Sequence, residues 1–167
     1  MEIKNNPLLW SVESGQERLA IFTSGRGIFC EIYWEAATKT ISDVWCGDSG
    51  TQEKFKEVLI TLLELAKQHK AKKWFANTYG MVGGFKSTEK WLKTDIMTQA
   101  ESIGITSEAV VFPKNIFANF SVKATAEALQ AANAGQGGLV LKTFLDPMEA
   151  QQWLKEQPLV RIPSLRK

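Results

Sequence analysis

Alternating apolar and polar positions in the first part of the chain predict an antiparallel sheet. Three stretches rich in β-branched and aromatic residues are separated by turn residues: 19-LAIFTS-24, 28-IFCEIYWEA-36 and 40-TISDVWC-46. In the middle stretch Glu31 and Glu35 share one face. We expect that face to contact water and the even-numbered face to pack against helices. The even-numbered residues are Ile28, Cys30, Ile32 and Trp34.

After Thr51 the hydrophobic period changes from two to that of a helix. Residues 52–69 contain no Gly or Pro, and their apolar residues recur three and four positions apart. The apolar positions are Phe55, Val58, Leu59, Leu62, Leu65 and Ala66. This stretch is predicted to form one amphipathic helix, with Gly47 to Thr51 as the turn and cap before it.

Beyond residue 70, short apolar runs alternate with helical patterns. The predicted strands are 73–78, 107–113 and 138–144, and the predicted helices are 88–104, 122–132 and one that starts after Asp146. Asp146 is expected to cap this last helix, with Pro147 in its first position.

An antiparallel meander followed by strand–helix units indicates an α/β fold with a mixed sheet and right-handed crossovers. The 167 residues suit a single domain, 1–167, with a core at about 19–156 and short terminal extensions.

Composition and charge argue against several classes of function. The 20 basic and 18 acidic residues are spread along the chain, for a net charge of +2, whereas nucleic-acid binding usually requires a clustered basic patch. No stretch approaches the roughly 20 apolar residues of a membrane span, and the first residues lack the apolar core of a signal peptide. We therefore expect a soluble, cytoplasmic protein that has no membrane span and does not bind nucleic acid.

The two cysteines, Cys30 and Cys46, are too few for a disulfide scaffold or a structural zinc site. They lie on two strands of the predicted meander, so they are either adjacent buried thiols or a redox pair. No metal and no cofactor are expected.

The string Cys46-Gly47-Asp48-Ser49-Gly50 resembles the surroundings of the nucleophile in chymotrypsin-like proteases. A serine nucleophile needs an adjacent base, and the one histidine, His69, lies at the far end of the predicted helix, about 25 Å away at 1.5 Å per residue. Ser49 is therefore interpreted as part of the turn and helix cap. His69 is interpreted as a partner of the helix dipole.

Six tryptophans are many for this length. Trp34, Trp91 and Trp153 fall on predicted apolar faces and are expected in the core. The other three, Trp10, Trp45 and Trp74, are harder to assign, and two of them exposed together would mark a binding surface.

The layout resembles the STAS superfamily, specifically SpoIIAA-like domains related to bacterial anti-sigma-factor antagonists. The resemblance covers about residues 19–156. It rests on the meander ending in 40-TISDVWCGD-48, the helix 52–69, the strand KKWFANT, the loop to STEKWL, the strand EAVVFP and the closing KTFLDPMEAQQWL. It implies a stand-alone bacterial STAS-like protein.

In the antagonists, a phosphorylated serine starts the helix after the strand and loop that correspond to 73–86. The resemblance therefore points to Ser87, or Thr88, as a regulatory phosphosite. The family motif is an Asp, paired serines and a glycine, and this chain has Lys86-Ser87-Thr88-Glu89. A simpler interpretation makes Ser87 an ordinary helix cap.

We expect this loop and helix start to be the surface for a ligand or partner, because glycine-containing loops beside helix N-termini are exposed and rich in free donors. The candidate residues are Asn77, Tyr79, Gly83, Gly84, Lys86 and Lys90.

Three functions follow from the sequence. The first is a non-enzymatic STAS-like domain that binds a regulatory protein or a small amphiphilic ligand held between the sheet and its helices. The second is a phosphorylation switch at Ser87. The third is a hydrolase that uses Ser49 or an acid pair such as Asp43 and Asp48. A homodimer through an exposed strand of the meander is a further expectation.

Overall fold

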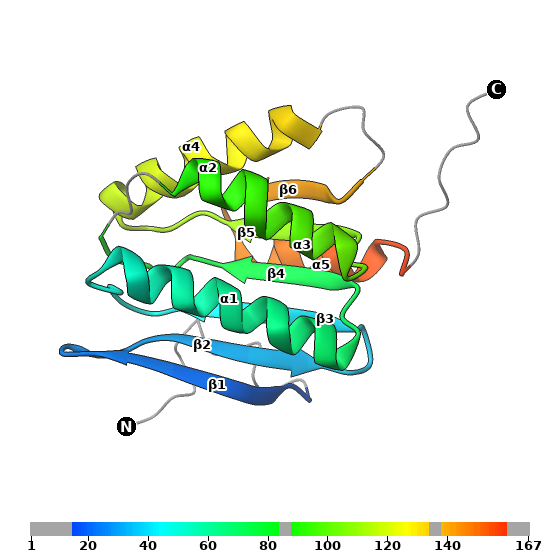
Figure 1. Cartoon of the computed structure of the whole chain (residues 1–167), viewed down its shortest axis with the longest axis horizontal. Helices are drawn as coiled ribbons and strands as arrows, with labels where there is room; N and C mark the ends of the chain where they lie inside the picture. The colour runs from blue at the N-terminus through cyan, green and yellow to red at the C-terminus, as the bar shows by residue number, and fades with distance from the viewer. Residues whose placement is uncertain (1–14, 84–87, 134–137, 160–167) are drawn as a thin grey trace.

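One sheet of six strands runs through the molecule in the order β1-β2-β3-β4-β5-β6 (Figure 1). The structure, a computed structural model, describes residues 15–83, 88–133 and 138–159. The strands are β1 (Glu17–Ser24), β2 (Gly27–Glu35), β3 (Thr40–Trp45), β4 (Lys73–Asn77), β5 (Ser107–Val111) and β6 (Val140–Phe144). The first three strands pair antiparallel, and β3 to β6 pair parallel. The predicted α/β class with a mixed sheet is confirmed.

The helices lie on both faces of this sheet. One face carries α1 (Gln52–His69), the continuous helix α2 (Glu89–Trp91), η3 (Leu92–Ile96) and α3 (Met97–Ser102), and α4 (Ile116–Asn133). Because β3 to β6 follow one another in one direction, right-handed crossovers place all three connections on the same face. Helix α5 (Pro147–Glu156) follows the last strand and packs on the opposite face, as Figure 1 shows.

Local capping fixes where the helices begin. Thr51 precedes α1 in an extended conformation, and its hydroxyl accepts a hydrogen bond from the Lys54 N–H at 3.2 Å. Asp146 caps α5 in the same way, accepting from the Met148 N–H at 3.0 Å, with Pro147 in the first turn. Both caps satisfy helix N–H groups that have no partner within the helix, so both sequence predictions are confirmed.

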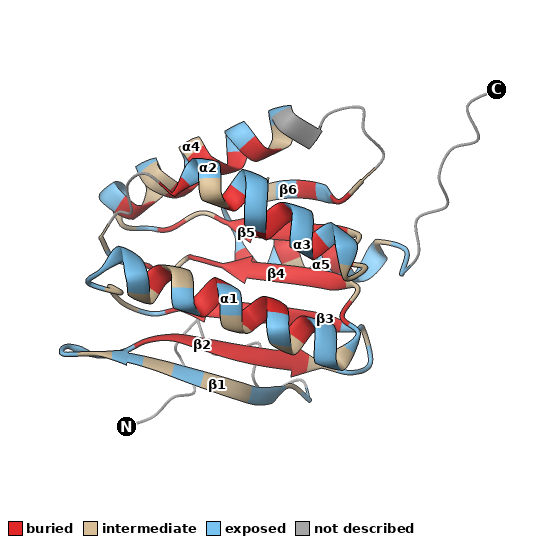
Figure 2. Cartoon of the chain, viewed as in Figure 1, coloured by how far each residue is buried: buried red, intermediate tan, exposed pale blue. Residues whose placement is uncertain are grey.

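Two layers of apolar side chains hold the helices to the sheet (Figure 2). The larger layer lies between the sheet and the three connections, and includes Ile32, Trp45 and Leu62. The smaller layer joins α5 to the back of the sheet through Phe75 and Leu154. As Figure 2 shows, β3, β4 and β5 are buried along their length, and α5 covers the back of β4 and β5.

Two predictions for the middle strand need correction. Cys30, Ile32 and Trp34 pack against the helices as expected, but Ile28, at the end of the strand beside the β1–β2 turn, is 47% exposed. Glu31 does not face water. It is 8% exposed, accepts a hydrogen bond from the Tyr33 hydroxyl and lies 3.5 Å from the Arg18 guanidinium.

Helix α4 also begins six residues earlier than predicted. The side-chain oxygen of Asn115 accepts hydrogen bonds from the N–H groups of Phe117 and Ala118, each at 3.1 Å. This cap starts the helix at Ile116, within a stretch that the apolar pattern alone left irregular. Among the described residues, no helix is both long and apolar enough to cross a bilayer.

Candidate ligand-binding cavity

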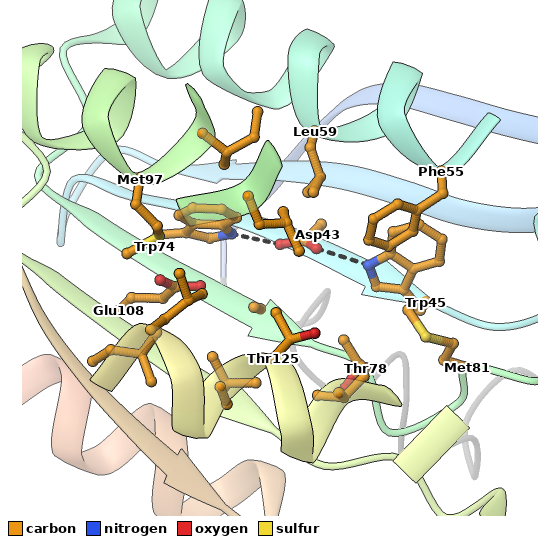
Figure 3. Close-up of a pocket in the computed structure, with 18 residues that line it drawn as sticks. Asp43, Trp45, Phe55, Leu59, Trp74, Thr78, Met81, Met97, Glu108 and Thr125 are labelled. Atoms are coloured by element: carbon orange, nitrogen blue, oxygen red, sulfur yellow. Dashed lines mark hydrogen bonds between the residues drawn. The ribbon is translucent and has the colours of Figure 1, made fainter. Parts of the chain in front are cut away.

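A cavity of about 70 Å³ lies between the sheet and the helices that cover its front face. It is floored by β3, β4, β5 and β6 and roofed by α1, the η3–α3 turn and α4 (Figure 3). Most of its lining is apolar. The apolar lining residues are Trp45, Phe55, Leu59, Trp74, Ala76, Met81, Leu92, Ile96, Met97, Val110, Val122, Ala126, Leu129 and Leu141.

The cavity exists because a small side chain occupies the middle of the sheet. Ala76 of β4 pairs with Asp43 on β3 and with Val110 on β5. Larger residues lie two positions away on the same side of the chain, Trp74 on β4 and Thr78 directly after its end. A single methyl group at the centre therefore leaves space beneath the helices.

The helix above this space contains one π-helical turn. In η3 the N–H of Met97 is bonded to the carbonyl of Leu92, five residues earlier. This turn places Leu92, Ile96 and Met97 together on the wall of the cavity. Single π turns are rare within helices and are frequent at functional sites.

A buried carboxylate stands at the centre of the cavity. Asp43 is 2% exposed, and its two oxygens accept hydrogen bonds from the indole N–H of Trp45 at 2.7 Å and of Trp74 at 2.6 Å. Figure 3 shows Asp43 held between these two rings. Because Asp43 and Trp45 are two residues apart on β3, and Trp74 lies on the neighbouring strand, the sheet fixes all three side chains.

Two other polar side chains in the cavity have a buried atom without a partner. These atoms are Oε2 of Glu108, on β5, and the hydroxyl of Thr125, on α4. The side chains are almost completely buried, at 4% and 6% exposed. A buried polar atom without a hydrogen bond costs free energy, so two of them in one cavity call for an explanation.

The apolar surroundings raise the pKa values of the two carboxyl groups in the cavity, Asp43 and Glu108. Burial raises the pKa of Asp43 to about 6, although the two indole hydrogen bonds oppose the rise. Burial, and then the charge of Asp43, raise the pKa of Glu108 well above its usual value. These directions favour a carboxylate at Asp43 and a protonated acid at Glu108 near neutral pH. Among the described lining residues there is no Lys, Arg or His.

The protease-like string does not form a catalytic site with His69. The Ser49 hydroxyl donates to the Thr51 carbonyl at 3.3 Å, just before α1. His69 lies at the other end of this 18-residue helix, which is about 27 Å long at 1.5 Å per residue. Its Nδ1 is 2.9 Å from the Leu65 carbonyl oxygen, and its ring packs on Trp34. Asp43 is paired in the cavity with Glu108 and not with Asp48, which is not among the lining residues.

Sequence reasoning did not identify Glu108 or Thr125. The signal for Glu108 was present in 107-SEAVVFP-113, where it shares a strand face with the apolar Val110. A charged residue on a buried strand face is unusual and points to a special environment. Thr125 carried no such signal, since a single uncharged threonine in a helix does not indicate a buried polar site.

None of the described loop candidates from the sequence, Asn77, Tyr79, Gly83 and Lys90, lines the cavity. Asn77 is 1% exposed on the strand face opposite the cavity, where its side-chain oxygen accepts from the Tyr79 N–H. The Tyr79 ring lies 5.7 Å from the Lys114 ammonium nitrogen. Lys90 is exposed at the start of the helix. From this loop, Met81 is the residue that lines the cavity.

The proposed phosphosite falls largely outside the described residues. Ser87, Gly84 and Lys86 are not among them. Thr88, which precedes α2, is 0% exposed, so a kinase cannot reach its hydroxyl in this conformation. Its side chain makes no capping bond.

Gly83 holds the loop closely against the segment before α1. The Val82 N–H donates to the Gly47 carbonyl at 3.1 Å, and a Cβ on Gly83 would lie 2.8 Å from a carboxylate oxygen of Asp48. The other Asp48 oxygen accepts from the Gly50 N–H at 2.8 Å, so this side chain is not free to move away.

Replacing Gly83 by alanine is therefore expected to destabilise the protein more than replacing Gly50. Both glycines have a positive φ, +77° and +78°, but a Cβ on Gly50 meets nothing within 4 Å. The Gly50→Ala variant should lose about 1 kcal/mol of unfolding free energy from backbone strain alone, and Gly83→Ala about 1–2 kcal/mol more because of the contact. Urea denaturation measures both. If both variants lose the same free energy of unfolding, the Asp48 side chain moves away from the new Cβ without a measurable energetic cost.

Two of the tryptophans that were hard to assign are part of the cavity. Trp45 and Trp74 are 1% and 3% exposed, so they do not form an exposed binding surface. Trp34 lies in the core as predicted, whereas Trp91 and Trp153 are partly buried against it. Trp10 lies outside the described residues.

A group of exposed apolar side chains lies away from these tryptophans, at the start of α4. Ile116, Phe117 and Phe120 are between 73% and 79% exposed. Patches of this kind often mark a surface that contacts another molecule.

The two cysteines lie near one another on the paired strands, as expected, but they are not both buried. Both are free, and Cys30 is buried whereas Cys46 is exposed. Burial raises the pKa of the Cys30 thiol, and the charge of Asp43 raises it further. Among the described residues, no group of three or more His, Cys, Asp and Glu side chains is placed to hold a metal ion.

Comparisons with protein-family models, with curated proteins and with solved structures gave no match.

Proposed function

We propose that this protein is a non-enzymatic, STAS-like binding domain whose site is the cavity between the sheet and its helices. The observation that carries the proposal is the pair of buried, unpartnered polar atoms, Glu108 Oε2 and the Thr125 hydroxyl, in an otherwise apolar space. Ligand pockets typically combine apolar walls with a few polar groups that fix orientation. A ligand with one polar group would satisfy these atoms and fill the space.

The size of the cavity limits the ligand. Its 70 Å³ is about half of the roughly 150 Å³ of an engineered cavity that binds benzene. A molecule of a few non-hydrogen atoms, or the end of a longer amphiphile, matches this volume.

Native mass spectrometry of the protein purified from its own host tests the proposal. We expect an added mass under native conditions that disappears on denaturation. An Ala76→Leu variant, purified in the same way, should lack the added mass, because the larger side chain fills the cavity. A bare wild-type protein, or the same added mass on the variant, would contradict binding at this site.

The exposed side chains at the start of α4 favour a second candidate, a protein partner or a second copy of the chain docked there. Phe117 and Phe120 lie one turn apart on this helix, and both are solvent-exposed. A Phe117→Ser change would weaken such an interaction and leave the cavity intact, which separates this function from the first.

A further inference from the structure

The charge of the cavity limits the chemistry of its ligand. Two carboxyl groups face the space, Asp43 and Glu108, and no described lining residue is basic. The charge of Asp43 raises the pKa of two nearby groups, Glu108 on β5 and Cys30 on β2, and neither of them can carry a positive charge. Every lining residue from α1, from the η3–α3 turn and from α4 is uncharged. A buried negative charge therefore lacks a cationic partner within the described residues, which is an unfavourable arrangement for an empty site.

All three polar groups can accept a hydrogen bond, Glu108 through the carbonyl oxygen of its protonated carboxyl and Thr125 through its hydroxyl oxygen. Asp43 has oxygen lone pairs beyond those used by the two indoles, and Glu108 Oε2 and the Thr125 hydroxyl have no partner. The cavity thus offers three oxygens, from β3, β5 and α4 (Figure 3). A primary ammonium group carries three N–H donors and no acceptor.

Resting on the proposed function, we propose that the ligand of this cavity is a small primary amine, bound as its ammonium ion between Asp43, Glu108 and Thr125. The apolar walls, such as Leu59 and Leu129, contact its hydrocarbon part. A carboxylate-bearing ligand is repelled by the charge of Asp43, and a neutral alcohol leaves that charge without a counter-ion.

Binding of three probes of nearly equal size tests this proposal: n-butylamine, 1-butanol and butyrate. Tryptophan fluorescence, with calorimetry as a second measurement, gives the three Kd values at pH 7.5 and constant ionic strength. At this pH both Asp43, with a pKa of about 6, and the amine are charged. We expect the amine to bind at least about 10-fold more tightly than the alcohol, as a charge-assisted hydrogen bond does, and butyrate not to bind.

The outcomes separate this inference from the proposed function. Equal Kd values for amine and alcohol would overturn the amine as ligand and leave a binding cavity. Binding of none of the three probes would overturn both. Binding of butyrate alone would contradict the charge argument.

Two variants show whether the preference arises in the cavity. Asp43→Asn should bring the ratio of the alcohol and amine Kd values close to one. Thr125→Val removes a hydroxyl that has no partner in the protein, so it is expected to fold, and it should weaken amine binding about 3- to 10-fold. Glu127→Gln, which removes an exposed charge from the same helix, is the control for net charge and should leave the ratio unchanged. A wild-type ratio in both cavity variants would overturn the proposal.

Discussion

Between pH 4 and pH 7 the wild type is expected to lose about 2 kcal/mol of unfolding free energy that an Asp43→Asn variant does not lose. The pKa of Asp43 is 3.8 in its ordinary state and about 6 in the fold, a difference of about two units. Each unit corresponds to about 1.4 kcal/mol, because the folded state holds the proton more tightly than the unfolded state.

The direction of the pH dependence follows from whether Asp43 ionises first in the folded or in the unfolded state. Below pH 3.8 the group is protonated in both states and costs nothing. As the pH rises to about 6, the unfolded chain ionises first, so the wild type loses stability across this window and no more above it. Asparagine does not titrate, so the stability of the variant does not fall across this pH window. The variant does leave one indole N–H without its acceptor, but this cost is the same at every pH.

Chemical denaturation at pH 4, 5, 6 and 7 measures the difference between wild type and variant. Asp95→Asn, the same change at an exposed position on η3, is the control and should not reproduce the pH dependence. A constant difference between wild type and Asp43→Asn from pH 4 to 7 would show that Asp43 ionises normally in the fold.

Filling the cavity is the second change with a large expected effect. Ala76→Val adds two methyl groups over the empty space and is expected to raise the free energy of unfolding by about 1–2 kcal/mol, at about 0.8 kcal/mol for each buried carbon. Valine also suits a strand. Ligand affinity should fall at least 10-fold, because the new side chain occupies the site.

Ala109 provides a matched control on the other face of the sheet. It is 0% exposed on β5 and packs with Ala150 and Leu154 under α5. Because Ala109 packs directly against these side chains, Ala109→Val should lower the free energy of unfolding by about 1–3 kcal/mol. Thermal denaturation of both variants gives the comparison. A loss of stability in Ala76→Val as large as in Ala109→Val would mean that the space above Ala76 is not available to a side chain.

The sequence predicted those elements whose signals are local. The helix 52–69 has the predicted bounds, since its apolar period is unbroken and Thr51 precedes it. The cap at Asp146 and the parallel arrangement of β3 to β6 also follow from short-range patterns and the handedness of crossovers. Helix α4 was predicted too short because its first turn places Ile116 and Phe117 in solvent, where an apolar pattern gives the wrong signal.

The candidate site depends on contacts between distant segments, which no local pattern contains. Trp45 and Trp74 were unassigned because their common partner, Asp43, becomes visible only when β3 and β4 pair. Glu108 joins them across a third strand. Asp43 was named from the sequence, but with Asp48 as its partner, because proximity along the chain was the available guide.

The indole N–H signals in a ¹⁵N–¹H correlation spectrum test the central claim, a ligand in the front cavity, most directly. The six tryptophans give separate indole signals, which single Trp→Phe variants assign. On addition of n-butylamine or 1-butanol, we predict that the signals of Trp45 and Trp74 shift, because both donate to Asp43 in the cavity. The signal of Trp153, on the opposite face of the sheet, should stay in place. Unmoved signals of Trp45 and Trp74 at saturating probe, or an equal shift at Trp153, would contradict the account.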